Sequence, residues 1–230
     1  MTFAELQTRT ASRLGEPSDP TLQQYYTPAE IGVALNAVNR LFCLLSLCLE
    51  TTGTLTLSTD GRPYYRMLNV FADWLLPLRV RITGGVKLKT SRESDLGALS
   101  LGWKATPGVP ERYVVTGFDL FGIYKQPTIA TTLEVTYARC PALLQNATDV
   151  PEIDGEYHPE LINGAIPFLR TKEGGQEWQK VLPLWDRFMA AAKKEADYVR
   201  ARAIEQGYDR MPFELEQFDS SVYLEGLAKL

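Results

Sequence analysis

Hydrophobic side chains recur at steps of three and four residues between positions 176 and 206, the spacing of one face of an α-helix. The large members of this face are Trp178, Val181, Leu182, Trp185, Phe188 and Met189. Gly174 and Gly175 precede the stretch, and Gly207 and Pro212 follow it, as glycine and proline do at helix ends. The pattern predicts one continuous helix, which at a rise of ~1.5 Å per residue would be roughly 45 Å long.

The second half of this predicted helix carries a narrow seam of small side chains. The seam consists of Ala192, Ala196, Val199 and Ala203. Small residues let another helix approach closely, but they bury too little area to hold a long helix by themselves. We therefore expect the seam to pack on a second helix of this chain or on a neighbouring copy, and we assign it to a candidate subunit interface.

Two capping signals predict helices near the N-terminus. Thr2 with Glu5 begins a short helix that ends at Gly15, and Thr27, followed by Pro28 and by Glu30, begins a longer one. The inward face of the longer helix is Ile31, Leu35, Val38, Phe42, Leu45 and Leu49.

The end of that longer helix is apolar nearly all round. Residues 41–49 contain one polar side chain, Ser46. Such a segment is expected between other elements, either in the core or between subunits. Leu41, Leu44 and Leu47 therefore join the candidate subunit interface.

From residue 51 the period changes to strict alternation, as in residues 54–58, which is typical of a half-buried strand. Short turns such as Asp60-Gly61 and Gly84-Gly85 separate further strand-like runs up to residue 138. Because no helix of 10–15 residues lies between these runs, they predict an antiparallel sheet or a small sandwich.

Helical patterning resumes at Pro159, although Gly164 and Pro167 lie inside the pattern and are expected to kink or shorten that helix. The predicted fold class is α+β, with helices, then a β-rich antiparallel insertion, then helices. The predicted domains are residues 1–50 (N-terminal helices), 51–155 (β-rich insertion), 156–207 (C-terminal helices) and 208–230 (a C-terminal arm).

The arm combines large apolar groups with acidic ones. The apolar members are Met211, Phe213, Leu215, Phe218, Val222, Tyr223, Leu224 and Leu227. A solvated tail seldom carries so many. The arm either folds back onto the helices of its own chain or becomes ordered on a partner protein, with its apolar side chains as anchors.

Composition narrows the choice of function. A net charge of −4 gives no broad positive field for gripping nucleic acid. Cys43, Cys48 and Cys140 lack metal-ligand spacing and are interpreted as reduced, buried residues. No export signal is recognised at the N-terminus, and residues 41–49 are too short to cross a bilayer. We expect no metal, no cofactor and no membrane partner.

Candidate chemistry is sparse. The single histidine, His158, has no nearby histidine or cysteine with which to bind a metal. Asp149, Glu152, Asp154 and Glu156 are close enough in sequence for acid–base pairing, but acidic residues in a turn-rich loop are usually just solvated. The aromatic residues Trp103, Tyr113, Phe118, Phe121 and Tyr124 suit either a sugar-binding platform or the core of a sheet. We assign no catalytic residue.

The order of landmarks resembles that of the head–tail connector (adaptor) proteins of tailed bacteriophages, over roughly residues 2–206. Residues 26–31 (Tyr-Thr-Pro-Ala-Glu-Ile) open a helix that runs into a strand, residues 133–137 (Leu-Glu-Val-Thr-Tyr) form the last strand, and residues 157–162 (Tyr-His-Pro-Glu-Leu-Ile) lead to the final helices. Between them stand Trp103, Pro110, Tyr113, Leu120, Tyr124 and Pro127, with Pro141, Pro151 and Ile153 after the last strand. These landmarks are structural and include no catalytic signature.

The resemblance implies a helical bundle with long helices that carries the β-rich insertion, and an extended C-terminal arm that reaches into the portal. It also implies a homo-oligomeric ring, commonly of twelve subunits, with tail or nozzle proteins below it. Double-stranded DNA would pass through the lumen without sequence-specific binding. Such a protein is expected at the head–tail junction of the virion, after assembly in the host cytoplasm.

We conclude from the sequence that the protein is a non-enzymatic head-to-tail adaptor. The alternative is a carbohydrate-binding or decoration module of a phage tail. A cell-wall hydrolase that uses the carboxylates of residues 149–156 ranks third.

Overall fold

The computed structural model describes residues 1–17, 24–117 and 119–212, except for the side chains of residues 176 and 177. The fold is mixed α+β, with 43% of residues in helices and 22% in strands. The described chain forms two compact units. The helical unit contains residues 1–48 and 141–199 with Pro212, and the β unit contains residues 49–140 and 200–211.

The helical unit consists of short and medium-length helices, of which the first two begin where the capping signals predict. The helices are α1 (Phe3–Leu14), α2 (Pro28–Ser46), the 3₁₀ turn η3 (Gly155–Tyr157), α4 (His158–Arg170), α5 (Gly175–Lys180) and α6 (Leu182–Glu205), whose last residues lie in the β unit. Thr2 with Glu5 and Thr27 with Glu30 each form a complete capping box, which satisfies amide donors that a helix start leaves unpaired. Gly15 ends α1 in the left-handed conformation.

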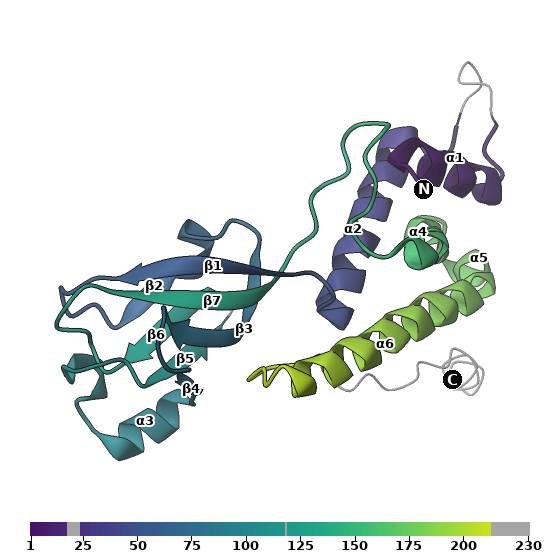
Figure 1. Ribbon diagram of the computed structural model, residues 1–230. Coiled ribbons are helices and arrows are strands. Elements are labelled where there is room, and N and C mark those ends of the chain that lie inside the picture. The colour runs from purple at the N-terminus through teal and green to yellow at the C-terminus, as the bar shows by residue number, and fades with distance from the viewer. Residues whose placement is uncertain (18–23, 118, 213–230) are drawn as a thin grey trace, which may run out of the picture. The chain divides into compact units, whose positions relative to one another are not determined.

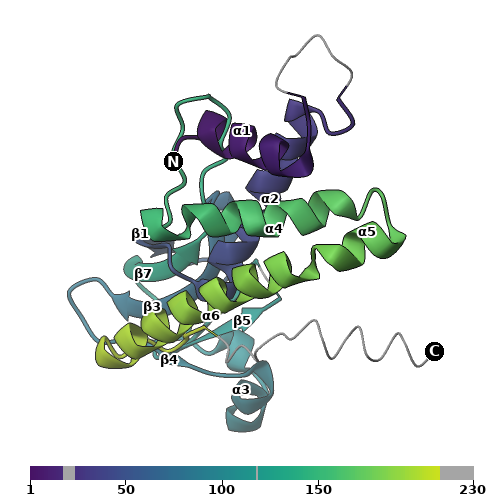
Figure 2. The same ribbon diagram turned by 90° about the vertical axis from the view of Figure 1, so that its right-hand side faces the viewer.

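The packing of α2 on α4 depends on Gly164. A Cβ at this position would lie 2.5 Å from Cγ1 of Val38 and 2.9 Å from the Phe188 ring. The Phe188 ring, on α6, also lies 6.1 Å from the ring of Phe42 on α2. Glycine therefore lets three helices meet closely at this point. Figure 2 shows α4 running beside α6 in this unit.

The predicted bundle with long helices is wrong. The structure divides the helix predicted over residues 176–206 into the six-residue α5 and the 24-residue α6, and the remaining helices have 7 to 19 residues. Pro183 provides the physical reason, because its ring has no N–H to donate and clashes with the carbonyl group four residues earlier. Conversely, α4 continues for three residues beyond Pro167.

The β unit contains two sheets (Figure 1). The three-stranded sheet has the order β1 (Glu50–Leu57), β7 (Thr131–Arg139), β3 (Trp74–Ile82), and both pairings are antiparallel. The four-stranded sheet has the order β2 (Tyr64–Arg66), β6 (Leu120–Tyr124), β5 (Arg112–Thr116), β4 (Lys89–Thr90). The β4–β5 pair is parallel, so the insertion is not wholly antiparallel as predicted. Shorter elements are η1 (Met67–Asn69), α3 (Glu93–Leu99) and η2 (Trp103–Ala105).

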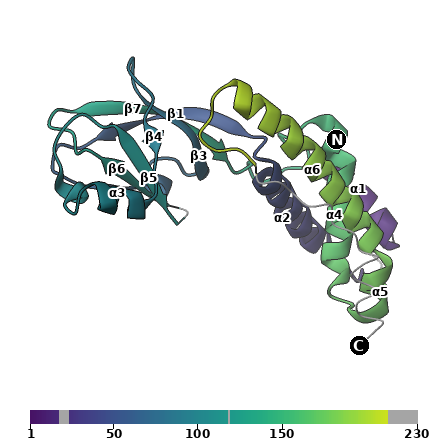
Figure 3. The same cartoon turned by 90° about the horizontal axis from the view of Figure 1, so that it is seen from below.

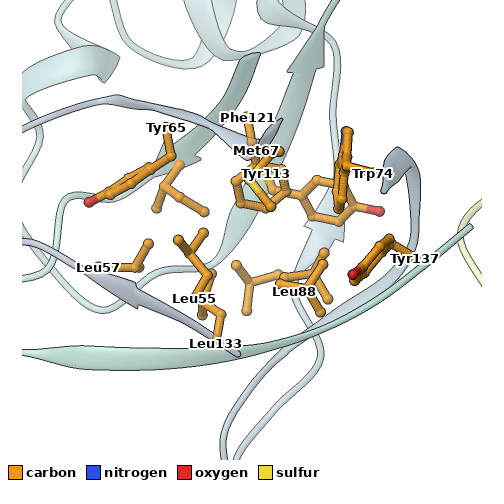
Figure 4. Packing of buried hydrophobic residues seen from close by; sticks show 13 residues of the cluster. Leu55, Leu57, Tyr65, Met67, Trp74, Leu88, Tyr113, Phe121, Leu133 and Tyr137 are labelled. Carbon is orange, nitrogen blue, oxygen red and sulfur yellow. The ribbon is translucent and has the colours of Figure 1, made fainter. Parts of the chain in front are cut away.

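The core of the β unit lies between these sheets. Figure 4 shows Leu55 and Leu133 from one sheet pointing toward Tyr113 and Phe121 from the other. The Tyr113 and Phe121 rings stack 5.4 Å apart. Alternation along the strands therefore places one face of each sheet in a shared apolar core.

The last turn of α6 and the residues after it belong to the β unit. Arg202 forms an ion pair with Glu50, 3.6 Å apart, at the start of β1. The N–H of Asp209 donates to the carbonyl of Leu78, and the Asp209 carboxylate accepts from the Tyr113 hydroxyl and pairs with Lys87. Residues up to 209 are thus held on β3 before the chain reaches its C-terminal segment.

Helix α2 is the one described helix that is long and apolar enough to cross a membrane, with a mean hydropathy of 1.3. Half of it is buried inside the protein, including Leu35, Val38 and Phe42. Burial of this kind is typical of the core helix of a soluble domain, and length with composition alone is weak evidence for a membrane span.

Candidate assembly surfaces

One face of α2 is an apolar surface that the described chain leaves uncovered. Val33 is 66% exposed and Leu44 is 46% exposed, while Ala37 and Leu41 between them are half-buried. The four residues follow the helical steps of four and three, so they form a continuous stripe, which we call the α2 stripe. Figure 3 shows α2 in the helical unit, with α4 and α6 beside it. The opposite face of α2 supplies the core.

Asn36 holds a loop along the border of the α2 stripe. Its side-chain amide donates to the carbonyl of Leu144 at 3.0 Å, and its side-chain oxygen accepts from the Leu144 N–H at 2.8 Å. The preceding residue, Leu143, is exposed. The pair of hydrogen bonds therefore presents a further apolar side chain next to α2, which enlarges the surface available for a contact.

The seven residues of the predicted subunit interface fall into two groups. Leu41 and Leu44 lie in the α2 stripe. Leu47, Ala192, Ala196, Val199 and Ala203 are each less than 5% exposed. The second group is already covered in the described chain and offers no free surface, so the assignment of those five residues to a subunit contact remains a prediction without support from their exposure.

Sequence reasoning missed two members of the α2 stripe, Val33 and Ala37. The predicted inward face, which begins at Ile31, accounts for only one of the two apolar series of this helix. The signal was present, because Val33, Ala37, Leu41 and Leu44 repeat at helical spacing.

The predicted portal-binding arm lies almost entirely outside the described residues. Phe213, Leu215, Phe218, Val222, Tyr223, Leu224 and Leu227 are not described. Met211 is described and is 38% exposed. Since residues up to 209 are bonded to the β unit, the segment available to reach a partner begins after them.

Each carboxylate of residues 149–156 accepts a hydrogen bond from a nearby backbone N–H or pairs with a lysine. Asp149 accepts from the backbone N–H groups of Asn146 and Gln145, and these bonds hold the pKa of its carboxyl below the usual value. Glu156 pairs with Lys194 at 3.1 Å, and hydrogen bonding to Lys194 likewise lowers the pKa of that carboxyl. Both groups are held ionised by fixed partners, whereas a general acid needs a raised pKa.

His158 is buried and also has structural partners. Its Nε2 lies 3.1 Å from the carbonyl oxygen of Ile153, and its Nδ1 lies 2.7 Å from the amino group of Met1. Among the residues that the structure describes, no group of three or more histidine, cysteine, aspartate and glutamate residues is arranged to hold a metal. The three cysteines are in the thiol form rather than in disulfides, with Cys43 buried and Cys48 and Cys140 half-buried.

The aromatic residues considered for a sugar platform belong mostly to the core. Trp103, Tyr113 and Phe121 are buried, and Tyr124 is half-buried. Phe118 lies outside the described residues. A sugar platform requires aromatic faces open to solvent, which these buried rings do not present.

Comparison with known families agrees with the sequence resemblance. Residues 1–212 match the family described as SU10 adaptor protein. No curated protein matches the chain. Because the match covers more than nine-tenths of the chain, the protein belongs to this family of structural bacteriophage adaptors, whose place in the virion is the head–tail junction.

Proposed function

We propose that this member of the SU10 adaptor protein family closes into a ring of identical subunits between the portal and the tail. The ring, with twelve subunits as the expected number, lets double-stranded DNA pass without recognising its sequence. Assembly takes place in the host cytoplasm, and tail or nozzle proteins bind below the ring.

The observation that carries the proposal is the α2 stripe. A subunit of a ring needs apolar surface that is open to a neighbour. Val33 and Leu44 provide such surface, since the described residues leave them exposed on a helix whose other face is fixed in the core. Full burial of one valine or leucine side chain contributes about 1.5–3 kcal/mol. When such a surface binds a different surface of the next copy, the contact repeats head to tail and closes if the rotation permits.

Two further features support the proposal. The C-terminal arm contains seven large apolar residues from Phe213 to Leu227, which suit docking into grooves of the portal. The net charge of −4 also suits a lumen that DNA must slide through, because binding to phosphates grows with the number of cationic contacts.

The test is assembly of the purified protein with and without a portal. We expect light scattering and negative-stain images to show rings, either from the full chain alone or after a purified portal ring is added. A chain that ends at Pro212 keeps the residues bonded to β3, so it is expected to fold normally and to lose portal capture. A stable monomer that ignores the portal would overturn the proposal, and retained portal capture by the truncated chain would remove the arm while leaving the ring.

A further inference from the structure

The two outer edges of the three-stranded sheet differ in how many of their backbone groups are hydrogen-bonded. Along β3, the carbonyl of Leu78 accepts from Asp209, the carbonyl of Val80 accepts from Leu88, and the N–H of Ile82 donates to Val86. These three bonds cover the β3 edge from residue 78 to residue 82.

The β1 edge is bare among the residues that the structure describes. The N–H of Arg139 donates to the carbonyl of Leu49, which makes these two residues a hydrogen-bonded pair in the β1–β7 register. In an antiparallel ladder the bonded pairs alternate, so the odd-numbered residues of β1 face β7 and the even-numbered ones face outward. Thr52, Thr54 and Thr56 therefore direct their N–H and C=O groups away from the sheet, and no backbone partner for them is found in the described part of the chain.

Beyond Glu50, its first residue, β1 contains nothing that discourages pairing. Residues 51–57 contain no proline and no charged side chain. The register with β7 is continuous over all eight residues, whereas the β3–β7 register is shifted twice. Natural proteins usually blunt such an edge with charges, prolines or bulges, and a long, regular, uncharged edge is a template for an added strand.

The two faces beside the β1 edge have different chemistry. On the core face Gly53 leaves room for the Phe71 ring, which a Cβ would overlap, and Val70 next to Phe71 is exposed. On the other face the side chains of Thr52, Thr54 and Thr56 are exposed. A strand added at this edge fits both faces if its side chains alternate between apolar and polar, with the apolar ones on the core face.

The chain carries such a segment immediately after Pro212. Phe213 and Leu215 alternate with Glu214 and Glu216, which is the period of a strand with one apolar face. Five residues, 213–217, equal the length of β1 from residue 52 to residue 56. The charges are also complementary, because the β unit has 14 Lys and Arg against 10 Asp and Glu, whereas residues 213–230 have four acidic residues and one lysine.

We propose that residues 213–217 of a second copy add to the β1 edge as a fourth strand of this sheet. The segment starts from the β3 side, where Asp209 is bonded, and the bare edge lies on the opposite side of the same sheet. Copies in a row therefore place the donor side of each sheet toward the acceptor edge of the next. This inference rests on the proposed ring. It divides the C-terminal arm, so that residues 213–217 bind the neighbouring sheet and only the later apolar residues, from Val222 to Leu227, dock on the portal.

The test uses hydrogen–deuterium exchange of the assembled full chain, read at single residues by mass spectrometry. The amides of Thr52, Thr54 and Thr56 are expected to exchange about tenfold more slowly than in a Leu215→Pro chain, because proline removes a donor and disrupts the added strand. The matched control is Leu224→Pro, which lies outside the donated segment and should leave the protection intact. The amides of Gly53 and Leu55, which face β7, should stay protected in every variant.

A mixing experiment identifies the donor. Isotope-labelled Leu215→Pro chains should regain protection at the three threonines when they are assembled with unlabelled wild-type chains. Protection that is present in dilute monomers and is not restored by mixing would mean pairing within one copy and would overturn the proposal. Rings whose threonine amides exchange freely would overturn the added strand but not the ring, whereas failure to form rings would count against the proposed function itself.

Discussion

Helices α2 and α6 both carry small or apolar positions that the sequence assigns to subunit contacts, yet the structure treats them in opposite ways. On α2 the assigned residue Leu44 is exposed, as is Val33, which the sequence did not assign, whereas the assigned Ala192 and Ala196 on α6 are fully buried. Alanine side chains are small, so another element can pack closely against the seam. Here elements of the same chain do so and bury it. A helix that is apolar on two faces can bury only one of them in the core, so the second face of α2 stays exposed in the described chain.

The largest effect is expected from charges placed on the α2 stripe. Val33→Glu combined with Leu44→Glu should weaken ring association by at least about 100-fold, because two carboxylates would be buried without partners. Sedimentation measures the association, and circular dichroism checks that the monomer stays folded. Val86→Glu is the matched control, since Val86 is a valine of similar exposure (68%) in the β unit. Rings that form normally with both stripe residues charged would show that the stripe is not the contact.

Substitutions in the buried alanine seam of α6 should change the free energy of unfolding rather than the formation of rings. Ala196→Leu adds bulk at a fully buried position and is expected to lower the free energy of unfolding by about 1–3 kcal/mol, as measured by urea denaturation. Tyr198→Leu, on the exposed face of the same helix, should change it far less. If Ala196→Leu left unfolding unchanged but abolished rings, the seam would be a contact between copies.

A smaller loss of stability is expected from a substitution at Gly164. Alanine normally stabilises a helix interior by up to about 1 kcal/mol relative to glycine. Here the new Cβ would lie 2.5 Å from Val38, so Gly164→Ala should lower the free energy of unfolding by about 1–2 kcal/mol. The control is Gly97→Ala in α3, where a Cβ meets nothing within 4 Å and a gain is expected. Adding Val38→Ala should recover part of the loss, and its failure to do so would point to another source of strain.

The smallest expected effect is a loss of thermal stability in acid, caused by protonation of Glu30. Hydrogen bonds from Lys172, and then from the Thr27 N–H, lower the pKa of Glu30 from 4.5 to about 2. A carboxyl whose pKa is lower in the folded state stabilises the protein above its unfolded pKa, and this contribution disappears as the pH falls from about 4.5 toward 2. The thermal midpoint of the wild type should therefore fall more between pH 5 and pH 3 than that of Glu30→Gln. Equal falls in the two proteins would show that the exposed pair contributes nothing.

The local signals in the sequence were reliable where a single turn of chain determines the outcome. The capping boxes at Thr2 and Thr27 form as predicted, because the hydrogen bonds of a cap involve residues three positions apart. The alternation around Leu55 also gave the correct buried face of β1. The prediction of one continuous helix over residues 176–206 is wrong at Pro183. This proline is a local helix-breaking signal, but the regular spacing of the apolar residues around it favours a continuous helix.

The candidate surfaces were harder to predict because exposure depends on distant parts of the chain. Leu44 and Leu47 are equally apolar and three residues apart, but only Leu44 is exposed. Leu47 ends α2 in the left-handed conformation and is buried. The bare β1 edge is likewise invisible in the sequence, since it depends on which strands lie on either side of β1.

The sequence by itself determined where most helices and strands begin and which of their faces are apolar, because these properties arise from neighbouring residues and from the period of the chain. It also contained the family relationship, through the order of its landmarks. Only the tertiary structure decided which apolar faces are covered and which strand edge is left open. Coverage is a property of residues far apart in the chain, and the free energy of burial is gained only when those residues meet.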